Sequence, residues 1–397
     1  SALRGLPGRR QSSEMAAPRP GPKIVIFVQE NHTTDNYFSS LAAWGANVAT
    51  GWPAAQNPPP SDQPHDRAAY FRWLQGKQGG TPYGNHVQYD ADTLLPFYAY
   101  LARTGAFFEN HATGLGTNSS PNHQMIVGGQ AMTLKNPPFN NPPVWDVPSL
   151  PALAVRNGLT WKGYTGSSGY PLQFYKDLRG SPNLVASSTF IADAQGGNLP
   201  DLSMVWHDAP YDEHPTADIT LGHNTIWQCV DAAVRGGEWN HTVFFLTWDD
   251  WGGFDDHVVL PCSEYTPDNV QVAPGPRVGL LMFGGRVAAG IDSRICVHAS
   301  ITRTAIQLLG LPNLGVPRVD GDPGLQDRYD PALSVPVPPA YGTTITQPVP
   351  PVPTPQPRPV PPAGYSPRPL DRVYLNGGGT IPPPNDAPLP PQPNPPS

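Results

Sequence analysis

The chain has 397 residues, and 54 of them are proline, about 14% against a usual share near 5%. Twenty-four of the prolines fall in residues 331–397, which predicts a proline-rich tail attached to a globular body. With 24 basic and 31 acidic residues, the net charge of −7 excludes a basic surface that would gather nucleic acid. The apolar runs are far shorter than the roughly 20 residues of a membrane helix, so we expect no membrane span.

We divide the chain into a flexible leader over residues 1–22, a catalytic domain over residues 23–330 and the tail over residues 331–397. Low charge and high proline content are typical of exported proteins, so we expect a secreted or extracytoplasmic protein whose signal peptide has been removed. Polyproline II segments such as 348–362 are stiff and suit docking to a surface or protein partner. Three cysteines without Cys-x-x-Cys spacing exclude a cysteine-only zinc site and permit at most one disulfide.

Strands and helices are predicted to alternate along the body. Apolar and β-branched runs predict strands at residues 23–28, 159–164, 202–206, 242–248 and 278–283. Helical spacing of apolar residues predicts helices between residues 92 and 107 and at 149–156, 222–234 and 300–309. Stretches rich in Gly, Pro, Asn and Asp predict long loops at 45–64 and 76–86. The alternation predicts an α/β fold, a three-layer α/β/α sandwich with a mostly parallel central sheet.

Polar residues follow the two most apolar strands at the point where each strand ends. Glu30 and Asn31 come after the first strand, and Asp249 and Asp250 come after the strand that ends at Trp248. Ligands of α/β sheets bind beyond the carboxyl ends of the strands, so we expect these side chains to converge at one edge. Taken alone, each pair is also typical of a simple turn after a strand, because Asp and Asn are common turn residues.

A converging group of carboxylates predicts a bound divalent metal ion, because like charges this close cannot all stay ionised without a counter-charge. Oxygen ligands that include the Asn31 amide favour Ca²⁺, Mg²⁺ or Mn²⁺. If His214 and His257 lie nearby, Zn²⁺ or iron competes, and the residues do not distinguish among these ions.

A serine in a polar stretch, residues 111–130, is a candidate nucleophile. The hydroxyl of Ser119 can be activated by a metal, and the amide of Asn122 can donate to the electrophile. The same residues also suit a plain Ser/Pro/Asn turn. His214 and His257 can protonate a leaving group near neutral pH. Neither a Gly-x-Ser-x-Gly elbow nor a Walker loop occurs, which excludes those two chemistries.

Four motifs occur in the order found in one enzyme family. They are Glu30-Asn31-His32-Thr33-Thr34-Asp35-Asn36-Tyr37-Phe38, Ser119-Ser120-Pro121-Asn122, Glu213-His214-Pro215 and Trp248-Asp249-Asp250-Trp251-Gly252-Gly253-Phe254-Asp255-Asp256-His257-Val258. Over residues 22–325 the chain resembles the bacterial phosphoesterase family, which unites phosphatidylcholine-type phospholipases C with acid phosphatases. The resemblance implies an alkaline phosphatase-like fold and a phosphoric ester hydrolase that acts on a small phosphate ester or a phospholipid head group through a phosphoserine intermediate.

The resemblance also implies roles for the residues that match the motifs. The implied metal ligands are Glu30, Asn31, Ser119, Asp249 and Asp250. The implied catalytic residues are Ser119 as the nucleophile, His214 at the phosphate and His257 at the edge of the site. The implied substrate-binding residues are Asn31, Asn122 and His86.

Three positions depart from the phospholipase branch of that family. The branch usually has threonine where Ser119 stands, arginine where His123 stands and an Asp-Glu pair where Asp249 and Asp250 stand. The serine and the double aspartate resemble the acid phosphatase branch instead, which leaves open whether the substrate is a phosphomonoester or a phosphodiester.

Two other functions remain as alternatives. One is a non-catalytic secreted or surface protein that keeps the phosphoesterase fold and uses the proline-rich tail for attachment or assembly. The other is a sulfatase or phosphonate hydrolase, which the sequence disfavours because His123 stands where the sulfatase Cys/Ser-x-Pro-x-Arg motif has arginine.

Overall fold

Alternate side chains of strand β1 (Lys23–Gln29) pack into two different cores. Ile24 and Ile26 belong to the core on one face of the sheet, whereas Val25 and Phe27 belong to the core on the other. A strand that is buried on both faces has a continuous apolar sequence, which is why this strand could be predicted. The central sheet is therefore the middle layer of three.

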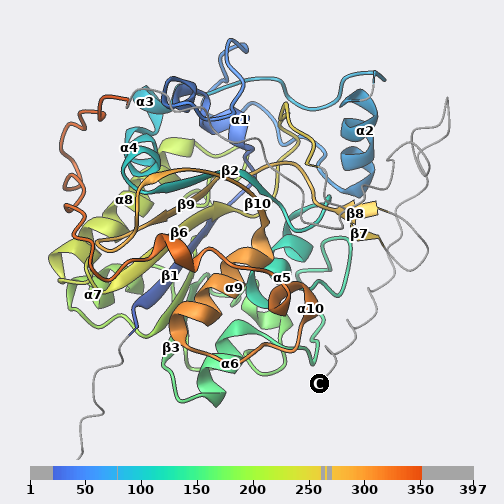
Figure 1. Ribbon diagram of the computed structural model, residues 1–397. Helices are drawn as coiled ribbons and strands as arrows, with labels where there is room; N and C mark the ends of the chain where they lie inside the picture. The colour runs from blue at the N-terminus through green and yellow to red at the C-terminus, as the bar shows by residue number, and fades with distance from the viewer. Residues whose placement is uncertain (1–20, 78, 261–263, 266–270, 351–397) are drawn as a thin grey trace, which may run out of the picture.

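The computed structural model describes residues 21–77, 79–260, 264–265 and 271–350. The remaining strands are β2 (Ala106–Ala112), β3 (Trp161–Thr165), β4 (Leu184–Ala186), β5 (Leu202–Trp206), β6 (Thr242–Trp248), β7 (Glu264–Tyr265), β8 (Gln271–Ala273), β9 (Leu280–Phe283) and β10 (Gly290–Val297). The main sheet has the strand order β10-β2-β9-β6-β1-β5-β3-β4 (Figure 1). β9 is antiparallel to both neighbours and the other pairs are parallel, which confirms the predicted mostly parallel sheet.

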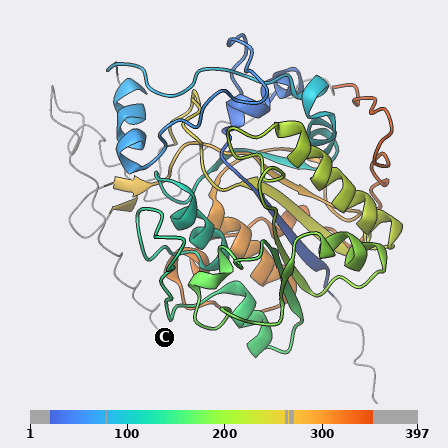
Figure 2. The same ribbon diagram turned by 180° about the vertical axis from the view of Figure 1, so that it is seen from behind.

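Helices cover both faces of this sheet. They are α1 (Thr34–Tyr37), α2 (Arg67–Lys77), α3 (Ala91–Leu94), α4 (Pro96–Thr104), α5 (Ser119–Gly128), α6 (Leu150–Arg156), α7 (Thr189–Gln195), α8 (Ile219–Arg235), α9 (His298–Leu309) and α10 (Pro317–Asp320), with short 3-10 turns at Ser39–Trp44, Leu172–Phe174 and Gln326–Arg328. α5, α6 and α9 pack on one face, and α4, α7 and α8 on the other, as the two opposite views show (Figures 1 and 2). The predicted α/β/α sandwich is confirmed.

The structure differs from the sequence-based expectation in several elements. The single helix expected between residues 92 and 107 is two helices, α3 and α4, because Leu95 precedes Pro96 and the proline ring disfavours a helical conformation there. Strand β2 was not expected, since Glu109, Asn110 and His111 interrupt its apolar run although all three are buried. Helix α5 was not expected either, because all of its residues are buried and it shows no amphipathic period.

The first part of the predicted tail lies against the body. Trp227 donates from its indole to the carbonyl of Pro339 at 2.8 Å, and Trp239 donates to the carbonyl of Val335 at 2.9 Å. Gln347 donates to the carbonyl of Pro96 at 2.8 Å. Residues up to 350 thus run along α8 toward α4 (Figure 1). The remainder of the predicted tail and most of the leader lie outside the described residues.

Two further expectations concern membranes and disulfides. In the ranges that the structure covers, none of the helices has the length and apolarity needed to cross a bilayer. Cys229 and Cys296 are both buried free thiols, and burial raises the pKa of each. Cys262 lies outside the described residues.

The buried imidazole of His111 predicts a specific loss of stability in acid. Its Nδ1 contacts the carbonyl of Val278 at 3.0 Å, and burial lowers its pKa from 6.5 to about 4. Between pH 6.5 and 4 the imidazole therefore binds a proton in the unfolded chain but stays neutral in the folded chain. The contribution of His111 to the free energy of unfolding is complete above pH 6.5 and is lost as the pH falls. We expect it to remove about 2 kcal/mol between pH 7 and pH 5.

Urea unfolding of wild type and His111→Gln at pH 7 and pH 5 measures this effect. The variant should lose about 2 kcal/mol less than wild type over that interval, since glutamine does not titrate. His241→Gln, at an exposed imidazole, is the control and should behave as wild type. Equal losses in His111→Gln and wild type would contradict the assignment.

Candidate active site

The carboxyl ends of β1 and β6 bring four of the predicted residues together. The two strands are neighbours, and Gln29 pairs with Trp248 in the last rung of their ladder. The backbone N–H of Asn31 donates to Asp249 Oδ1 at 3.1 Å, and the N–H of Asp249 donates to the carbonyl of Gln29 at 3.0 Å. Glu30, Asn31, Asp249 and Asp250 therefore converge at one sheet edge.

The backbone at this edge requires a particular pair of residues. Asn31 has φ 66°, in the left-handed region that asparagine tolerates better than most residues. Gly252 has φ 59°, and a Cβ atom there would lie 2.3 Å from the carbonyl oxygen of Asn31. The N–H of Gly252 donates to Asp250 Oδ1 at 2.8 Å. The glycine thus allows the two loops to approach closely and holds the Asp250 carboxylate in place.

Ser119 reaches the same group from the other side. It is the first residue of α5, which follows β2 after a loop, and its side chain is almost fully buried. Its Oγ lies 3.0 Å from Asp250 Oδ2, 3.3 Å from Glu30 Oε2 and 3.5 Å from Asn31 Oδ1. All five predicted metal ligands therefore lie close together, with the other four each in contact with Asn31.

The carboxylates of this group repel one another in a buried setting. Burial raises the pKa of Asp250 to about 8, and the charge of Glu30 adds to the shift. Burial also raises the pKa of Asp249 well above its usual range, with Asp250 and Glu30 contributing. Burial opposes ionisation of Glu30 too, but the hydrogen bond and charge of His123 lower its pKa overall. Full ionisation of all three carboxylates needs additional positive charge nearby.

A second buried acidic group in the protein has its own positive charge. The guanidinium of Arg277 lies 3.0 Å from Asp35 Oδ1 and 2.8 Å from Asp256 Oδ1. Across the described residues, no Lys or Arg forms an ion pair with Glu30, Asp249 or Asp250. The group at the ends of β1 and β6 therefore has imidazoles beside it in place of a guanidinium or ammonium group.

The Asn31 side chain fits a bound cation at this place. Its amide oxygen lies 3.0 Å from Asp249 Oδ1 and 3.2 Å from an oxygen each of Glu30 and Asp250, so it faces only acceptors. Turning the amide would make its nitrogen a donor to these carboxylates, but would aim its oxygen at His214 Nε2. A cation among the carboxylates would favour the first orientation, because the amide oxygen can be its ligand and the amide nitrogen cannot. Four oxygens facing one another suit a hard divalent ion.

Two histidines meet the nitrogen end of the Asn31 amide. His65 Nδ1 lies 2.6 Å from the carbonyl of Gln63, and its Nε2 lies 3.4 Å from Asn31 Nδ2. His214 Nδ1 contacts the carbonyl of Pro215, and its Nε2 lies 3.1 Å from the amide. Backbone contacts at both Nδ1 atoms thus orient both Nε2 atoms toward the site.

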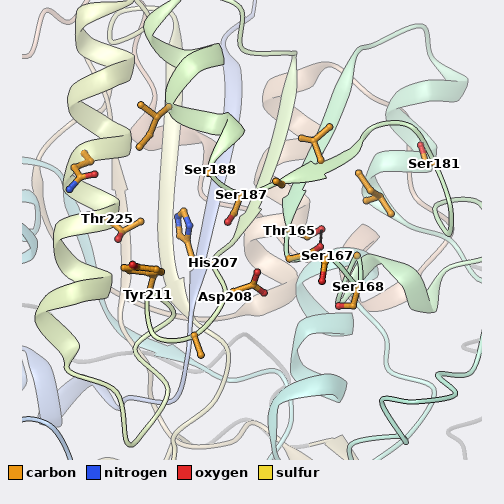
Figure 3. Close-up of a pocket in the computed structure, with 18 of the residues that line it drawn as sticks. Thr165, Ser167, Ser168, Ser181, Ser187, Ser188, His207, Asp208, Tyr211 and Thr225 are labelled. Atoms are coloured by element: carbon orange, nitrogen blue, oxygen red, sulfur yellow. Dashed lines mark hydrogen bonds between the residues drawn. The ribbon is translucent and has the colours of Figure 1, made fainter.

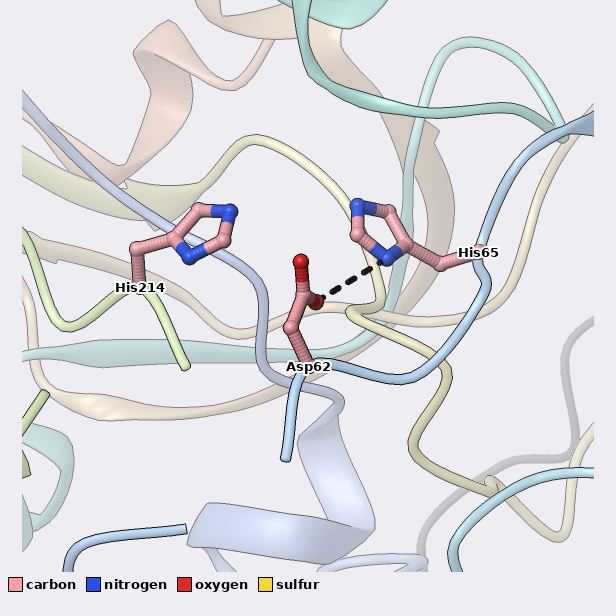
Figure 4. A group of neighbouring side chains, drawn as sticks. All are labelled: Asp62, His65 and His214. Carbon is pink, nitrogen blue, oxygen red and sulfur yellow. Dashed lines mark ion pairs between the residues drawn. The ribbon is translucent and has the colours of Figure 1, made fainter. Parts of the chain in front are cut away.

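His65 was not among the predicted site residues. With Asp62 and His214 it forms a group whose ligand atoms lie within 4.8 Å of one another, and Asp62 Oδ1 is 3.5 Å from His65 Nδ1 (Figure 4). His65 Nε2 also lies 3.8 Å from Asp250 Oδ2. The only local signal was the spacing Asp62-x-x-His65 in a loop rich in Pro and Asp, which is too common in loops to identify a site.

His123 contacts the carboxylates of Glu30 and Asp249. The indole N–H of Trp206 donates to His123 Nδ1 at 3.0 Å, so the proton of the neutral ring lies on Nε2. That Nε2 lies 3.0 Å from Glu30 Oε1 and 3.3 Å from Asp249 Oδ2. The histidine at this position therefore orients two of the acidic side chains.

A buried glutamate holds the segment that carries His214. Glu213 has φ 70°, and its carboxylate accepts from Tyr98 at 2.5 Å and from Tyr37 at 2.9 Å. It also accepts from Gln29 at 3.0 Å and from Trp248 at 2.9 Å. Burial raises the pKa of Glu213 to about 7, and these four hydrogen bonds oppose the shift. The bonds fix a left-handed backbone directly before His214.

Three predicted residues make their side-chain contacts elsewhere. The Asn122 amide donates to the carbonyls of Leu115, Thr117 and Asn118, so it closes the loop before α5. His86 Nδ1 lies 2.9 Å from Asp255 Oδ2, and its ring stacks on Trp52. His257 Nδ1 lies 2.6 Å from Asp35 Oδ2.

In the described structure, Asn122, His86 and His257 make no hydrogen bond with Glu30, Ser119, Asp249 or Asp250. Their substrate-binding and catalytic roles stay predictions.

A pocket of about 280 Å³ lies next to the acidic group. Its lining residues are Val28, Glu30, Ser119, Asn136, Phe139, Gly166, Tyr170, Trp206, His207, Asp208, Ala209, Asp212 and His214. A hydroxyl, carboxylates and an imidazole therefore face one small space. This set can present a nucleophile and a proton donor to a single small anion.

Comparisons with known proteins show similarity to phospholipases C. The chain is 24% identical over 247 residues to non-specific phospholipase C5 of Arabidopsis thaliana, covering 58% of this chain and 46% of that protein. It is 22% identical over 346 residues to the non-hemolytic phospholipase C of Burkholderia pseudomallei, covering 66% of this chain and 48% of that protein. The chain thus spans about half the length of these relatives.

Among solved structures, murine ectonucleotide pyrophosphatase/phosphodiesterase 5 aligns with a TM-score of 0.45 at 11% identity, covering 78% of this chain and all of that one. The model of the Phosphoesterase family matches residues 22–312. This match covers most of the chain and includes all four motifs, so the protein belongs to the Phosphoesterase family.

Proposed function

We propose that this chain is a metal-dependent phosphoric ester hydrolase that acts through a phosphoserine intermediate on Ser119. The position of Ser119 Oγ carries this proposal, since it lies in the pocket within 3.3 Å of the carboxylates of Asp250 and Glu30. Membership of the Phosphoesterase family supports the reaction class. The relatives' names, phospholipases C, support a phospholipid as one candidate substrate, and a small phosphate ester is the other.

Glu30, Asn31, Ser119, Asp249 and Asp250 would hold the divalent ion, because together they offer oxygen atoms and up to three negative charges. When bound, the ion supplies positive charge at the phosphoryl oxygens and lowers the pKa of the serine hydroxyl. The oxygen donors favour Mg²⁺, Ca²⁺ or Mn²⁺, while the imidazoles of His65 and His214 keep Zn²⁺ and iron as alternatives.

The reaction has two halves, both at Ser119. In the first, the Ser119 hydroxyl gives its proton to the carboxylate of Asp250, and Ser119 Oγ forms a bond to phosphorus while the bond from phosphorus to the alcohol oxygen breaks. That alcohol oxygen takes a proton from His214. In the second, water gives a proton to His214 and attacks phosphorus, the bond from phosphorus to Ser119 Oγ breaks, Oγ takes the proton back from Asp250, and phosphate leaves. His214 suits proton donation, because the charges of Glu30, Asp62 and Asp250 outweigh burial and raise its pKa.

We also propose that the enzyme works outside the cytoplasm. The low charge content and the proline-rich composition support this location. The two described cysteines are buried with raised pKa values, so neither depends on a reducing environment to stay a thiol.

The serine assignment predicts a large loss of turnover in Ser119→Ala. Removing the nucleophile should lower kcat for a chromogenic phosphomonoester by about a thousandfold or more. Ser120→Ala is the matched control, because the Ser120 hydroxyl lies 3.0 Å from the Tyr170 hydroxyl and makes no hydrogen bond to the carboxylates. Rates in Ser119→Ala that match those of the control would defeat the proposal.

If the carboxylates bind a cation, the difference in stability between Asp250→Asn and wild type should change sign when the ion is added. In chelator the variant should be more stable than wild type, because one of three repelling carboxylates is gone. With saturating divalent ion the order should reverse, since only wild type gains the binding free energy, about 2.7 kcal/mol at an ion concentration one hundred times Kd.

Thermal unfolding with and without the ion, together with elemental analysis, measures this reversal. Asp146→Asn, at the exposed ion pair with Lys176, is the control and should follow wild type in both conditions. A wild-type Tm that no divalent ion raises would count against metal dependence.

The support given by Glu213 predicts a combined loss in Glu213→Gln. The amide replaces an acceptor oxygen by an N–H donor that faces existing donors, which should cost about 2 kcal/mol of stability and lower kcat through His214. Glu238→Gln is the control, since Glu238 is buried at the opposite end of β1, 2.7 Å from Lys23 Nζ. That variant should lose stability but keep kcat, and the same outcome in Glu213→Gln would contradict the positioning role.

A further inference from the structure

A second and larger cavity adjoins the pocket that contains Ser119. Its volume is about 890 Å³, within the usual range of ligand pockets. Four residues line both spaces, namely Gly166, His207, Asp208 and Ala209. They follow the carboxyl ends of β3 and β5, and a Cβ atom on Gly166 would lie 1.9 Å from Asp208 Oδ1, so the two loops meet closely there. A molecule that reaches Ser119 can extend past this boundary.

Eight of the nineteen residues that line this cavity carry a hydroxyl group, and apolar side chains such as Leu184 and Ile191 make up part of the rest. Figure 3 shows Ser167, Ser187 and Ser188 around one hollow with His207 and Asp208. Within the described part of the chain, the hydroxyls of these three serines make no hydrogen bond, so they are available to a ligand. A hydroxyl can both donate and accept, and therefore matches other hydroxyls.

The charge and the aromatic content of the lining disfavour two other classes of ligand. Among its described residues there is no Lys or Arg, and Asp208 is the one carboxylate, which disfavours an anionic group. His207 adds no positive charge at neutral pH, because burial lowers its pKa to about 4. A quaternary ammonium group needs several aromatic faces, and Tyr211 is the one aromatic residue of the described lining.

We propose that this cavity binds the organic part of the phosphate ester, and that this part is an uncharged polyhydroxylated group with the chemistry of a sugar or a cyclitol. The inference rests on the proposed function, because it assumes that the phosphoryl group lies at Ser119. It adds the substrate class, which the family membership leaves open.

A substrate panel on the wild-type holoenzyme tests the proposal directly. It compares kcat/KM for glucose 6-phosphate, phosphatidylinositol in detergent micelles, phosphocholine and p-nitrophenyl phosphate. We expect one of the two polyol compounds to exceed phosphocholine by about tenfold or more, because the cavity offers hydroxyl partners to a polyol and a single aromatic residue to a quaternary ammonium group. The first two compounds distinguish a free sugar phosphate from a lipid head group. Phosphocholine turnover equal to or above both would overturn the proposal.

A double variant tests the serines themselves. Ser187→Ala with Ser188→Ala should lower kcat/KM for the preferred polyol ester by about tenfold, while p-nitrophenyl phosphate changes less than about twofold. Ser334→Ala, at an exposed serine before Val335 and away from the cavity, is the control and should change neither. Equal losses for both esters would overturn the assignment of the cavity to the organic group.

A failure of the hydrolase proposal can be distinguished from a failure of the cavity proposal. Turnover of p-nitrophenyl phosphate that is absent, or that survives Ser119→Ala, would defeat the hydrolase proposal while the cavity is still tested by binding. Titration calorimetry of the holoenzyme with glucose 6-phosphate and with phosphatidylinositol micelles then decides whether the cavity binds a polyol group. Binding that the double variant weakens supports the cavity, and the absence of binding to both refutes it.

Discussion

Repulsion among three buried carboxylates at the ends of β1 and β6 is the constraint around which this edge of the protein is built. Asp249 and Asp250 are fully buried, and Glu30 is only slightly exposed. Burial of charge without compensation is unfavourable by several kcal/mol for each ion. Elsewhere in the protein, the buried carboxylates of Asp35 and Asp256 are compensated by the guanidinium of Arg277.

The neighbours of the acidic group are themselves held by contacts that point away from it. Trp206 fixes the ring of His123, and backbone carbonyls contact the Nδ1 atoms of His65 and His214. Glu213 in turn fixes the backbone before His214 through four hydrogen bonds. Such outer contacts set the orientation and the tautomer of a side chain before any ligand arrives, which lowers the cost of binding.

The pocket that contains Ser119 and the larger cavity beside it have different kinds of walls. Around Ser119 the walls carry several carboxylates and imidazoles, whereas the adjoining cavity has one carboxylate, Asp208, and many hydroxyl groups. The boundary lies where the loops after β3 and β5 meet, at Gly166 and Asp208. A phosphate ester has the same division, with its charge at phosphorus and its identity in the organic group. The topology thus allows reaction chemistry and substrate choice to reside on different loops.

The sequence by itself determined the five central strands of the sheet and the acidic edge. Strands buried on both faces have continuous apolar sequences, so β1, β5 and β6 and the acids that follow β1 and β6 could be predicted. Only the tertiary structure decided that His65 reaches the site and that Asn122 closes a loop instead. The physical reason is that loop conformation and side-chain hydrogen bonds depend on residues distant in sequence, and these leave no periodic signal along the chain.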